Sequence, residues 1–498
     1  MDGSRVVSLW KSPTTPDISS GIIQAVKHVL DDAEGSPSQI AAVMIGTTHF
    51  TNAFVEGKGL LEVGTMRIGL PAGRALPPMV DWPENLRHAV GPHIYQVHGG
   101  YHYDGRENAP LDEAEVRTAA RGMRDKGLRA VAIAGIFSHV NAAQEERAAE
   151  IVRSELPDAA ITISSRIGRI GMLERENAAI INASLAELSR EVVRSFRQSL
   201  ETLEIDAPFY LSQNDGTLMN ADFAEEHPVL TFASGPTNSM RGAAYLSGVK
   251  DGVVADIGGT TTDVGVLAHG FPRESSTPAN IGGVRTNFRM PDVLSVGLGG
   301  GSHVRSGEQV TVGPDSVGFR LSEQGVVFGG DILTASDIAV AGGRAKMGDP
   351  ARIGHLAPSL IESGLDAIHL KLEEAVDRMK TSSDEVPLVL VGGGTVLISR
   401  PIAGTSKVVV PENAAVANAI GAAIAQVGGE VDRVFAYDEI GRDAAIQTAT
   451  AEAVSQAIEA GAIRETVQTV DVEEVHLQYI PGGVVRLRVR VVGDLEIG

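Results

Sequence analysis

Apolar runs alternate with amphipathic stretches along most of this chain, and that alternation is typical of an α/β protein. The pattern is clearest between residues 112 and 164. Helical spacing over 112–126 and 141–155 is followed each time by a short apolar run, at 129–137 and 160–164. A repeated helix–strand order of this kind predicts a parallel sheet with helices covering it.

The same reasoning predicts the remaining elements. We expect helices over 21–31, 174–203, 234–246, 359–379 and 412–427, and strands over 6–10, 41–45, 208–211, 253–255, 264–267 and 387–391. Residues 470–492 predict a terminal hairpin, whereas 67–105, rich in Pro, Gly, His and aromatic residues, predicts an irregular lid or interface. We divide these elements into a first lobe (1–205), a second lobe (206–430) and a C-terminal extension of a helix and a hairpin (431–498).

The most informative stretch is VVADIGGTTTDVGVL, at 253–267, where two apolar strands flank a polar turn. Gly258 and Gly259 have no Cβ, so their backbone amides can approach a phosphate closely. Hydroxyl donors follow at Thr260, Thr261 and Thr262. The flanking carboxylates, Asp256 and Asp263, are suited to holding Mg²⁺ or to orienting an attacking group. We therefore expect a nucleotide-phosphate site; the alternative is a tight Gly-Gly hairpin with a purely structural role.

Several loops follow predicted strands, and the carboxyl ends of parallel strands are where α/β proteins bind ligands. The candidate substrate contacts are Thr47, Thr48, His49, Asn52, Asn214 and Asp215, with Ser138 to Asn141 as a weaker candidate. Each has a structural alternative: His49 can serve a loop hydrogen bond, and Asn-Asp-Gly is a strong turn signal. The glycines of LGGGS (298–302), Gly299 and Gly300 among them, can approach a ligand or form a turn. Glu174 to Asn177 is interpreted as a charged helix cap.

The composition argues against several classes of partner and of chemical site. A net charge of −21 argues against nucleic acid or an anionic membrane surface as a partner. With no cysteine, the chain has no disulfide, thiolate nucleophile or zinc–thiolate site. No signal pattern or bilayer-spanning apolar run is present, so we expect a cytoplasmic enzyme.

Seven motifs occur in one order: GTTHFTNA (46–53), QNDGTLM (213–219), SGP (234–236), DIGGTTTDV (256–264), LGGGS (298–302), VGGGT (391–395) and VANAIGAA (416–423). Together they resemble the hydantoinase A/5-oxoprolinase family, which includes relatives of acetone carboxylase. That family lies within the superfamily of actin, sugar kinases and heat-shock chaperones. The resemblance implies a two-lobed, actin-like α/β ATPase fold whose mixed sheets are covered by helices. It also implies that Gly392, Gly393, Gly394 and Thr395 contact adenosine.

The resemblance further implies an ATP- and Mg²⁺-dependent enzyme that opens a cyclic amide, such as a hydantoin, 5-oxoproline or a lactam, by phosphorylating its carbonyl. In that role Asp256, Asp263 and His49 would be catalytic, and a B-type subunit would complete the enzyme. The sequence also leaves open a small-metabolite kinase, a carboxylase, a non-catalytic nucleotide-binding partner and a homo-oligomer.

The chain departs from the family at its start. Relatives begin earlier, with a first strand and an Asp-x-Gly-Gly-Thr hairpin that is absent here, so we expect a first lobe that is N-terminally incomplete. Either the recorded start lies downstream of the true one, which we favour, or the chain is short and a poor ATPase.

Overall fold

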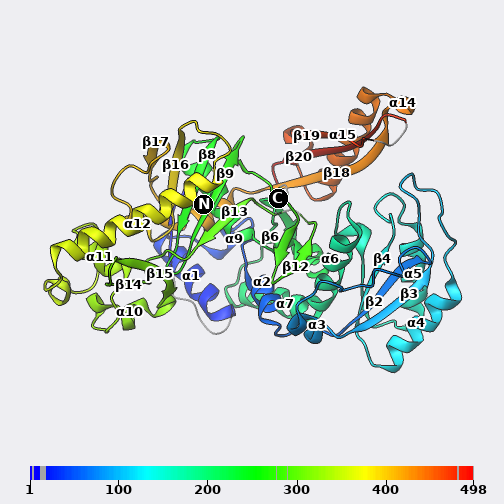
Figure 1. Cartoon of the computed structure of the whole chain (residues 1–498), viewed down its shortest axis with the longest axis horizontal. Coiled ribbons are helices and arrows are strands. Elements are labelled where there is room, and N and C mark those ends of the chain that lie inside the picture. Colours follow the sequence, from blue (N-terminus) through cyan, green and yellow to red (C-terminus); the bar gives the residue numbers. More distant parts are fainter. Residues whose placement is uncertain (3–4, 12–17, 276, 289, 479–481, 497–498) are drawn as a thin grey trace.

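The computed structural model describes residues 1–2, 5–11, 18–275, 277–288, 290–478 and 482–496. The elongated molecule in Figure 1 has one sheet near each end and a third large sheet that starts between them. Among the described residues, no helix has both the length and the apolar character that crossing a membrane requires.

The sheet drawn in green and yellow contains the predicted hairpin (Figure 1). Strand β8 (Gly252–Ile257) runs antiparallel to β9 (Thr262–Ala268) and parallel to β16 (Val386–Val391). Helix α12 (Pro358–Met379) packs on one face, which carries Val253 and Ala255, and α9 (Ser234–Ser247) packs on the other, which carries Val254. The strands predicted over 253–255, 264–267 and 387–391 and the helices predicted over 234–246 and 359–379 are thus confirmed.

The far end of the molecule is a four-stranded parallel sheet in the order β3-β2-β4-β5. Its strands are β2 (Val63–Leu70), β3 (His93–His98), β4 (Ala130–Gly135) and β5 (Ala160–Ile163). Helices α4 (Glu113–Asp125) and α5 (Ala143–Glu155) cover it. The predicted helix–strand repeat, and with it the parallel sheet, is confirmed.

The prediction of an irregular segment over 67–105 is wrong, because β2, α3 (Glu84–Ala89) and β3 lie there. Strand β2 is buried on both faces, so it lacks the alternation that reveals a half-exposed strand. Two of the segment's four histidines make local ion pairs: His93 pairs with Glu62, and His98 with Glu115.

The third sheet has the order β1-β6-β7-β18-β20-β19. Its strands are β1 (Val43–Ile45), β6 (Phe209–Ser212), β7 (Thr217–Asn220), β18 (Gln426–Ala436), β19 (Gln468–His476) and β20 (Val484–Gly493). The terminal hairpin is confirmed as β19 and β20. Strand β1 is at the sheet edge and, among the described strands, pairs with β6 alone.

Two further predictions need correction. The helix expected over 412–427 is only α13 (Ala417–Ala423), because the chain enters strand β18 at Gln426 and pairs with the distant strand β20 from Val427 onward. No strand forms over 6–10; Trp10 there stacks on His28, with ring centroids 3.6 Å apart. Apolar residues do not make a strand when no neighbouring strand pairs with them.

The helix expected over 174–203 is two helices, α6 (Met172–Ser184) and α7 (Ala186–Thr202), divided at the buried Leu185. Helix α15 (Arg442–Glu459) packs a row of alanines on β18 and β20, the row being Ala445, Ala449, Ala453 and Ala457. The boundary that we placed at 430/431 falls inside β18, and the three-part division of the chain stays a prediction.

The remaining elements are short or peripheral. They are α1 (Ile18–Asp32), α2 (His49–Glu56), α8 (Ala221–Glu226), α10 (Leu321–Gln324), α11 (Ala335–Ala341), α14 (Tyr437–Ile440), β10 (Phe271–Pro272), β11 (Ala279–Ile281), β12 (Val284–Thr286), β13 (Val293–Val296), β14 (Ser302–Arg305), β15 (Thr311–Ser316) and β17 (Thr405–Val409).

Candidate active site

The β8–β9 turn presents its backbone to solvent. The amide of Gly258 donates to the carbonyl of Thr261 at 2.9 Å, which closes the turn. The next three residues, Gly259, Thr260 and Thr261, are exposed, and their amides donate to no other group in the described part of the chain. Three adjacent unpaired N–H groups make a concave surface suited to a phosphate.

Two carboxylates flank this turn from paired positions on β8 and β9, where Asp256 lies opposite Asp263. Burial raises the pKa of Asp256, against the smaller effects of a hydrogen bond from Ser239 and the charge of Lys11. Burial also raises the pKa of Asp263, against a hydrogen bond from Ser295, and the charge of Asp256 adds to the rise. Each ionised carboxylate therefore gains from a nearby cation.

The donor set fits Mg²⁺, which proteins commonly hold through one or two carboxylates together with phosphate oxygens and water. The described ranges contain no group of three or more acidic or histidine side chains placed to hold a metal ion. A metal role for Asp256 and Asp263 stays a prediction.

The glycine loop at 298–302 is hydrogen-bonded to the β8–β9 turn. The amide of Gly300 donates to Gly258 O at 3.0 Å, and that of Gly301 donates to Gly259 O at 2.7 Å. A Cβ on Gly299 would lie 2.6 Å from the backbone nitrogen of Thr260, so only glycine fits there. The loop positions the hairpin with amides already bonded to protein, and a phosphate contact by Gly299 or Gly300 stays a prediction.

The glycines after β16 pack beside Asp256. Gly392 has a φ of +87°, and a Cβ there would lie 2.3 Å from Asp256 Oδ1. The amide of Gly394 donates to Ile257 O at 2.7 Å. Gly393 lies beside the ammonium group of Lys11, a contact that no sequence signal indicated. The structure brings this turn against the hairpin; adenosine contacts by Gly392 to Thr395 stay a prediction.

The first turn of α9 joins the predicted substrate loop to the hairpin. At its start, Ser234 Oγ donates to the Thr47 carbonyl at 3.0 Å. Further along, Ser239 donates to Asp256, and Asn418 Nδ2 donates to both Gly235 O and Ser239 Oγ, at 2.8 and 3.3 Å. Because these bonds form one chain, the loop after β1 is held close to the hairpin.

The other residues of that loop are less tightly placed. Thr48 lies beside the α9 N-terminus, and His49 is the first residue of α2. Asn52 is exposed on α2. The roles proposed for Thr47, Thr48, His49 and Asn52 stay predictions.

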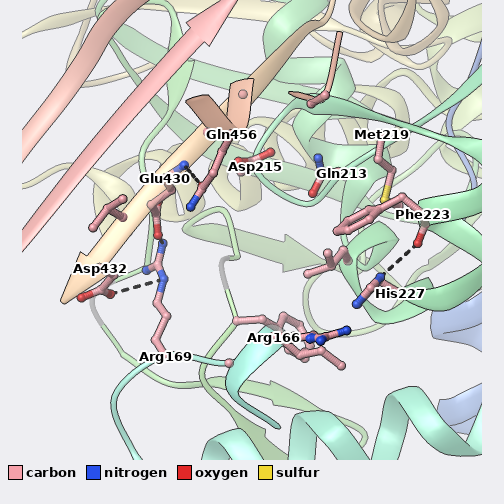
Figure 2. Close-up of a pocket in the computed structure, with 18 of the residues that line it drawn as sticks. Arg166, Arg169, Gln213, Asp215, Met219, Phe223, His227, Glu430, Asp432 and Gln456 are labelled. Carbon is pink, nitrogen blue, oxygen red and sulfur yellow. Dashed lines mark hydrogen bonds and ion pairs between the residues drawn. The ribbon is translucent and has the colours of Figure 1, made fainter. Parts of the chain in front are cut away.

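A cavity of about 880 Å³ lies between the loop after β4, the turn after β6 and strand β18 (Figure 2). The turn after β6, including Asn214 and Asp215, lines one wall, and Ser138 and His139 after β4 line another. Strand β18 contributes Glu430 and Asp432, close to Arg169. No residue of 256–263 lines this cavity, and neither do Thr47, Thr48, His49 and Asn52, although the loops that contain Thr47 and Asn214 follow the neighbouring parallel strands β1 and β6.

Asp215 has a clear structural role. One of its carboxylate oxygens accepts from both the backbone nitrogen and the hydroxyl of Thr217, at 3.0 and 2.6 Å, as in an Asx turn. The turn alternative considered for this motif is therefore present, and a substrate contact by Asp215 stays a prediction.

The interpretation of Glu174 to Asn177 as a charged cap is wrong. Arg175 and Glu176 are fully buried, and Glu176 makes a two-point ion pair with Arg67, which is equally buried on β2. Sequence reasoning missed this pair, although an arginine inside the apolar run TMRIG was a usable signal.

The loop after β4 contains a histidine whose surroundings keep it neutral. Burial, together with the charge of Arg175, lowers the pKa of His139 to about 4. The guanidinium of Arg175 lies 3.1 Å from His139 Nδ1 and has only hydrogens to offer, so Nδ1 accepts and the ring proton is on Nε2. The neighbouring Phe137 has a φ of +55°, a backbone strain often found at functional sites.

Two family models match the chain. One, described as the hydantoinase/oxoprolinase N-terminal region, matches residues 1–156, and the other, described as hydantoinase/oxoprolinase, matches 175–354. The chain belongs to the hydantoinase/oxoprolinase family. The resemblance that the seven motifs predicted is thus confirmed.

Curated relatives of this hydantoinase/oxoprolinase chain include caprolactamase subunit alpha from Pseudomonas jessenii, 27% identical over 395 residues, which covers 74% of this chain and 55% of the relative. Another is the acetophenone carboxylase gamma subunit from Aromatoleum aromaticum, which is 28% identical over 376 residues. That match covers 68% of this chain and 50% of the relative. The chain therefore spans about half the length of the curated relatives it matches.

Among solved structures, an ATP-dependent caprolactamase from Pseudomonas jessenii superposes with a TM-score of 0.79 at 20% identity, covering 100% of this chain and 86% of that one. A nucleotide-free acetone carboxylase gives a TM-score of 0.67 at 19% identity, covering 98% and 84%. These likenesses confirm the predicted ATPase-type α/β fold of the hydantoinase/oxoprolinase chain.

Proposed function

We propose that this chain is the ATP-binding subunit of an enzyme that opens a cyclic amide with the free energy of ATP hydrolysis. One observation carries the proposal: the β8–β9 turn exposes the unpaired amides of Gly259, Thr260 and Thr261 between two paired carboxylates. A phosphate group satisfies those amides, and Mg²⁺ bound to the phosphate offsets the charge of Asp256 and Asp263. Family membership and relatives named for lactam hydrolysis support the substrate class.

Amides resist hydrolysis because resonance stabilises the carbonyl. In the proposed reaction the carbonyl oxygen attacks the γ-phosphorus, an O–P bond forms, and the bond to ADP breaks. Cyclic amide, ATP and two water molecules then give the open-chain amino acid, ADP and phosphate. The chain's own groups have two tasks, which are to hold the phosphates with backbone amides and to orient the substrate near them.

Relatives whose names mark them as subunits support a partner chain that completes the enzyme. A B-type hydantoinase/oxoprolinase subunit is our candidate, and a cytoplasmic location belongs to the same proposal.

ADP release tests the function. The chain is incubated with MgATP, with and without the partner subunit, against panels of lactams and hydantoins, of sugars and polyols, and of ketones with bicarbonate. We expect ADP release and an opened ring, seen by mass spectrometry, with lactams or hydantoins alone. Release that depends on sugars would make the chain a kinase, release with ketone and bicarbonate a carboxylase, and no release with any panel would refute the proposal.

A further inference from the structure

Lys11 brings a positive charge to the β8–β9 hairpin from the N-terminal segment of the chain. Its side chain is exposed, and its Nζ lies 3.2 Å from the position that a Cβ on Gly393 would take. Its charge acts on the carboxylate of Asp256, which precedes the phosphate turn. Among the described residues this ammonium group has no hydrogen-bond or ion-pair partner, so its N–H groups are open to a ligand that arrives from solvent.

The ammonium group lies where two predicted nucleotide contacts meet. One is the glycine turn after β16 (392–395), for which we predict contacts with adenosine, and the other is the phosphate turn (259–261). The strands that precede these turns, β16 and β8, pair in parallel, and the amide of Gly394 donates to Ile257 O at 2.7 Å. A nucleotide that uses both turns has to run its phosphate chain across this junction, and Lys11 stands beside it.

The charges at the junction call for a cation. Burial raises the pKa of Asp256 and of Asp263, which lie opposite each other on β8 and β9. Lys11 supplies a positive charge that acts on Asp256, whereas the charge that acts on Asp263 is that of Asp256. A bound triphosphate adds further negative charge, of which Mg²⁺ offsets only a part. An ammonium group is suited to the rest, because it binds phosphate oxygens with charge-assisted hydrogen bonds.

The backbone that carries Lys11 is tied to helix α1. The ring of Trp10, the preceding residue, stacks on His28 with ring centroids 3.6 Å apart. The hydroxyl of Ser8 donates to Asp32 Oδ2, at the end of α1, at 2.7 Å. Because the segment is anchored while its long side chain ends in an exposed ammonium group, Lys11 can reach a ligand without any rearrangement of the fold.

We propose that Lys11 binds the phosphate chain of ATP, its ammonium group donating hydrogen bonds to phosphate oxygens between the turn at 392–395 and the turn at 259–261. The proposal rests on the proposed function, because ATP is a reactant there. It adds a binding residue that belongs to none of the seven motifs, and it gives the N-terminal segment a part in the site.

Protection from acetylation tests the contact directly in the wild-type chain. An amine-selective acetylating reagent modifies exposed lysines, and mass spectrometry of the digested protein gives the rate at each one. We expect saturating MgATP to slow the acetylation of Lys11 at least tenfold, and adenosine to leave it unchanged. Lys126, an exposed lysine that follows α4 in the far sheet, should react at the same rate throughout. Acetylation of Lys11 at an undiminished rate with MgATP would overturn the proposal.

Variants measure the contribution to affinity. Lys11→Met keeps an apolar side chain and removes the charge, so MgATP should bind at least about tenfold more weakly in isothermal titration. Lys11→Arg should recover most of that affinity, and Lys126→Met should bind as the wild type does. Since both lysines are exposed, urea denaturation should give the same free energy of unfolding for all three variants as for the wild type. Unchanged MgATP affinity in Lys11→Met would refute the role.

The two proposals fail in different ways. ATP binding that depends on Lys11, together with no ADP release in any of the substrate panels, would refute the proposed reaction and leave the role of Lys11 intact. ADP release with lactams, together with an unprotected Lys11, would refute the role of Lys11 and leave the reaction intact. A wild-type chain that binds no MgATP would refute both.

Discussion

Gly259 offers a test of whether the β8–β9 turn is built for a ligand. It is exposed, its φ lies outside the left-handed region, and a Cβ placed on it meets no other atom within 4 Å. The protein alone therefore has no steric reason for a glycine here. Gly259→Ala should leave the free energy of unfolding unchanged or raise it by up to about 1 kcal/mol, since alanine lowers the entropy of the unfolded chain.

A bound phosphate changes that expectation. A phosphate oxygen that accepts from the amides of the turn lies against the Gly259 Cα, where the added methyl group stands in its way. Loss of one hydrogen bond to a charged group costs about 1.5–3 kcal/mol, which corresponds to roughly 10- to 150-fold weaker binding. We therefore expect Gly259→Ala to separate stability from ATP affinity.

Urea denaturation and isothermal titration with MgATP measure the two quantities. Gly354→Ala is the matched control, because it is also exposed and its nearest neighbour to a new Cβ, Ala351 O, is 3.6 Å away. Gly299→Ala is the opposite case: its Cβ would overlap the hairpin backbone, so stability and affinity should fall together. If Gly259→Ala binds ATP as the wild type does, no phosphate approaches this turn and our account of the site is wrong.

Three further predictions follow from buried charges. Asp263→Asn should raise the thermal midpoint by about 1–3 °C in metal-free buffer, because burial disfavours the ionised carboxylate of Asp263. The same substitution should abolish Mg²⁺-dependent turnover, and an unchanged turnover would contradict the metal role. Glu176→Ala leaves Arg67 buried and unpaired, so we expect a loss of about 3–5 kcal/mol in urea denaturation, against at most about 1 kcal/mol for the exposed Glu187→Ala. The pKa of His139 in the folded protein, about 4, lies below the ordinary value of 6.5, so the unfolded chain binds a proton more readily and the protein loses stability as the pH falls from 6.5 toward 4. Over that range the free energy of unfolding of the wild type should fall by about 2–3 kcal/mol more than that of His139→Gln. Parallel pH curves for the two proteins would refute this prediction.

The sequence by itself determined the elements whose signals are local. The apolar strands and polar turn of 253–267, the helix–strand repeat after residue 112 and the terminal hairpin were all predicted within a few residues. Each of these signals comes from residues that are neighbours in the chain. The conformational freedom of glycine marks a turn, and the spacing of apolar residues marks a helix or a strand. The family could be predicted for the same reason, since its motifs are short and contiguous.

Only the tertiary structure decided how distant segments meet. Strand β2 was hidden because burial on both faces removes alternation, and β18 was hidden because its partner β20 is far along the chain. The same holds for the burial of Arg67 against Glu176. Burial and charge pairing depend on which surfaces come together in space. The sequence of one segment does not contain that information, because the partner surface belongs to another part of the chain.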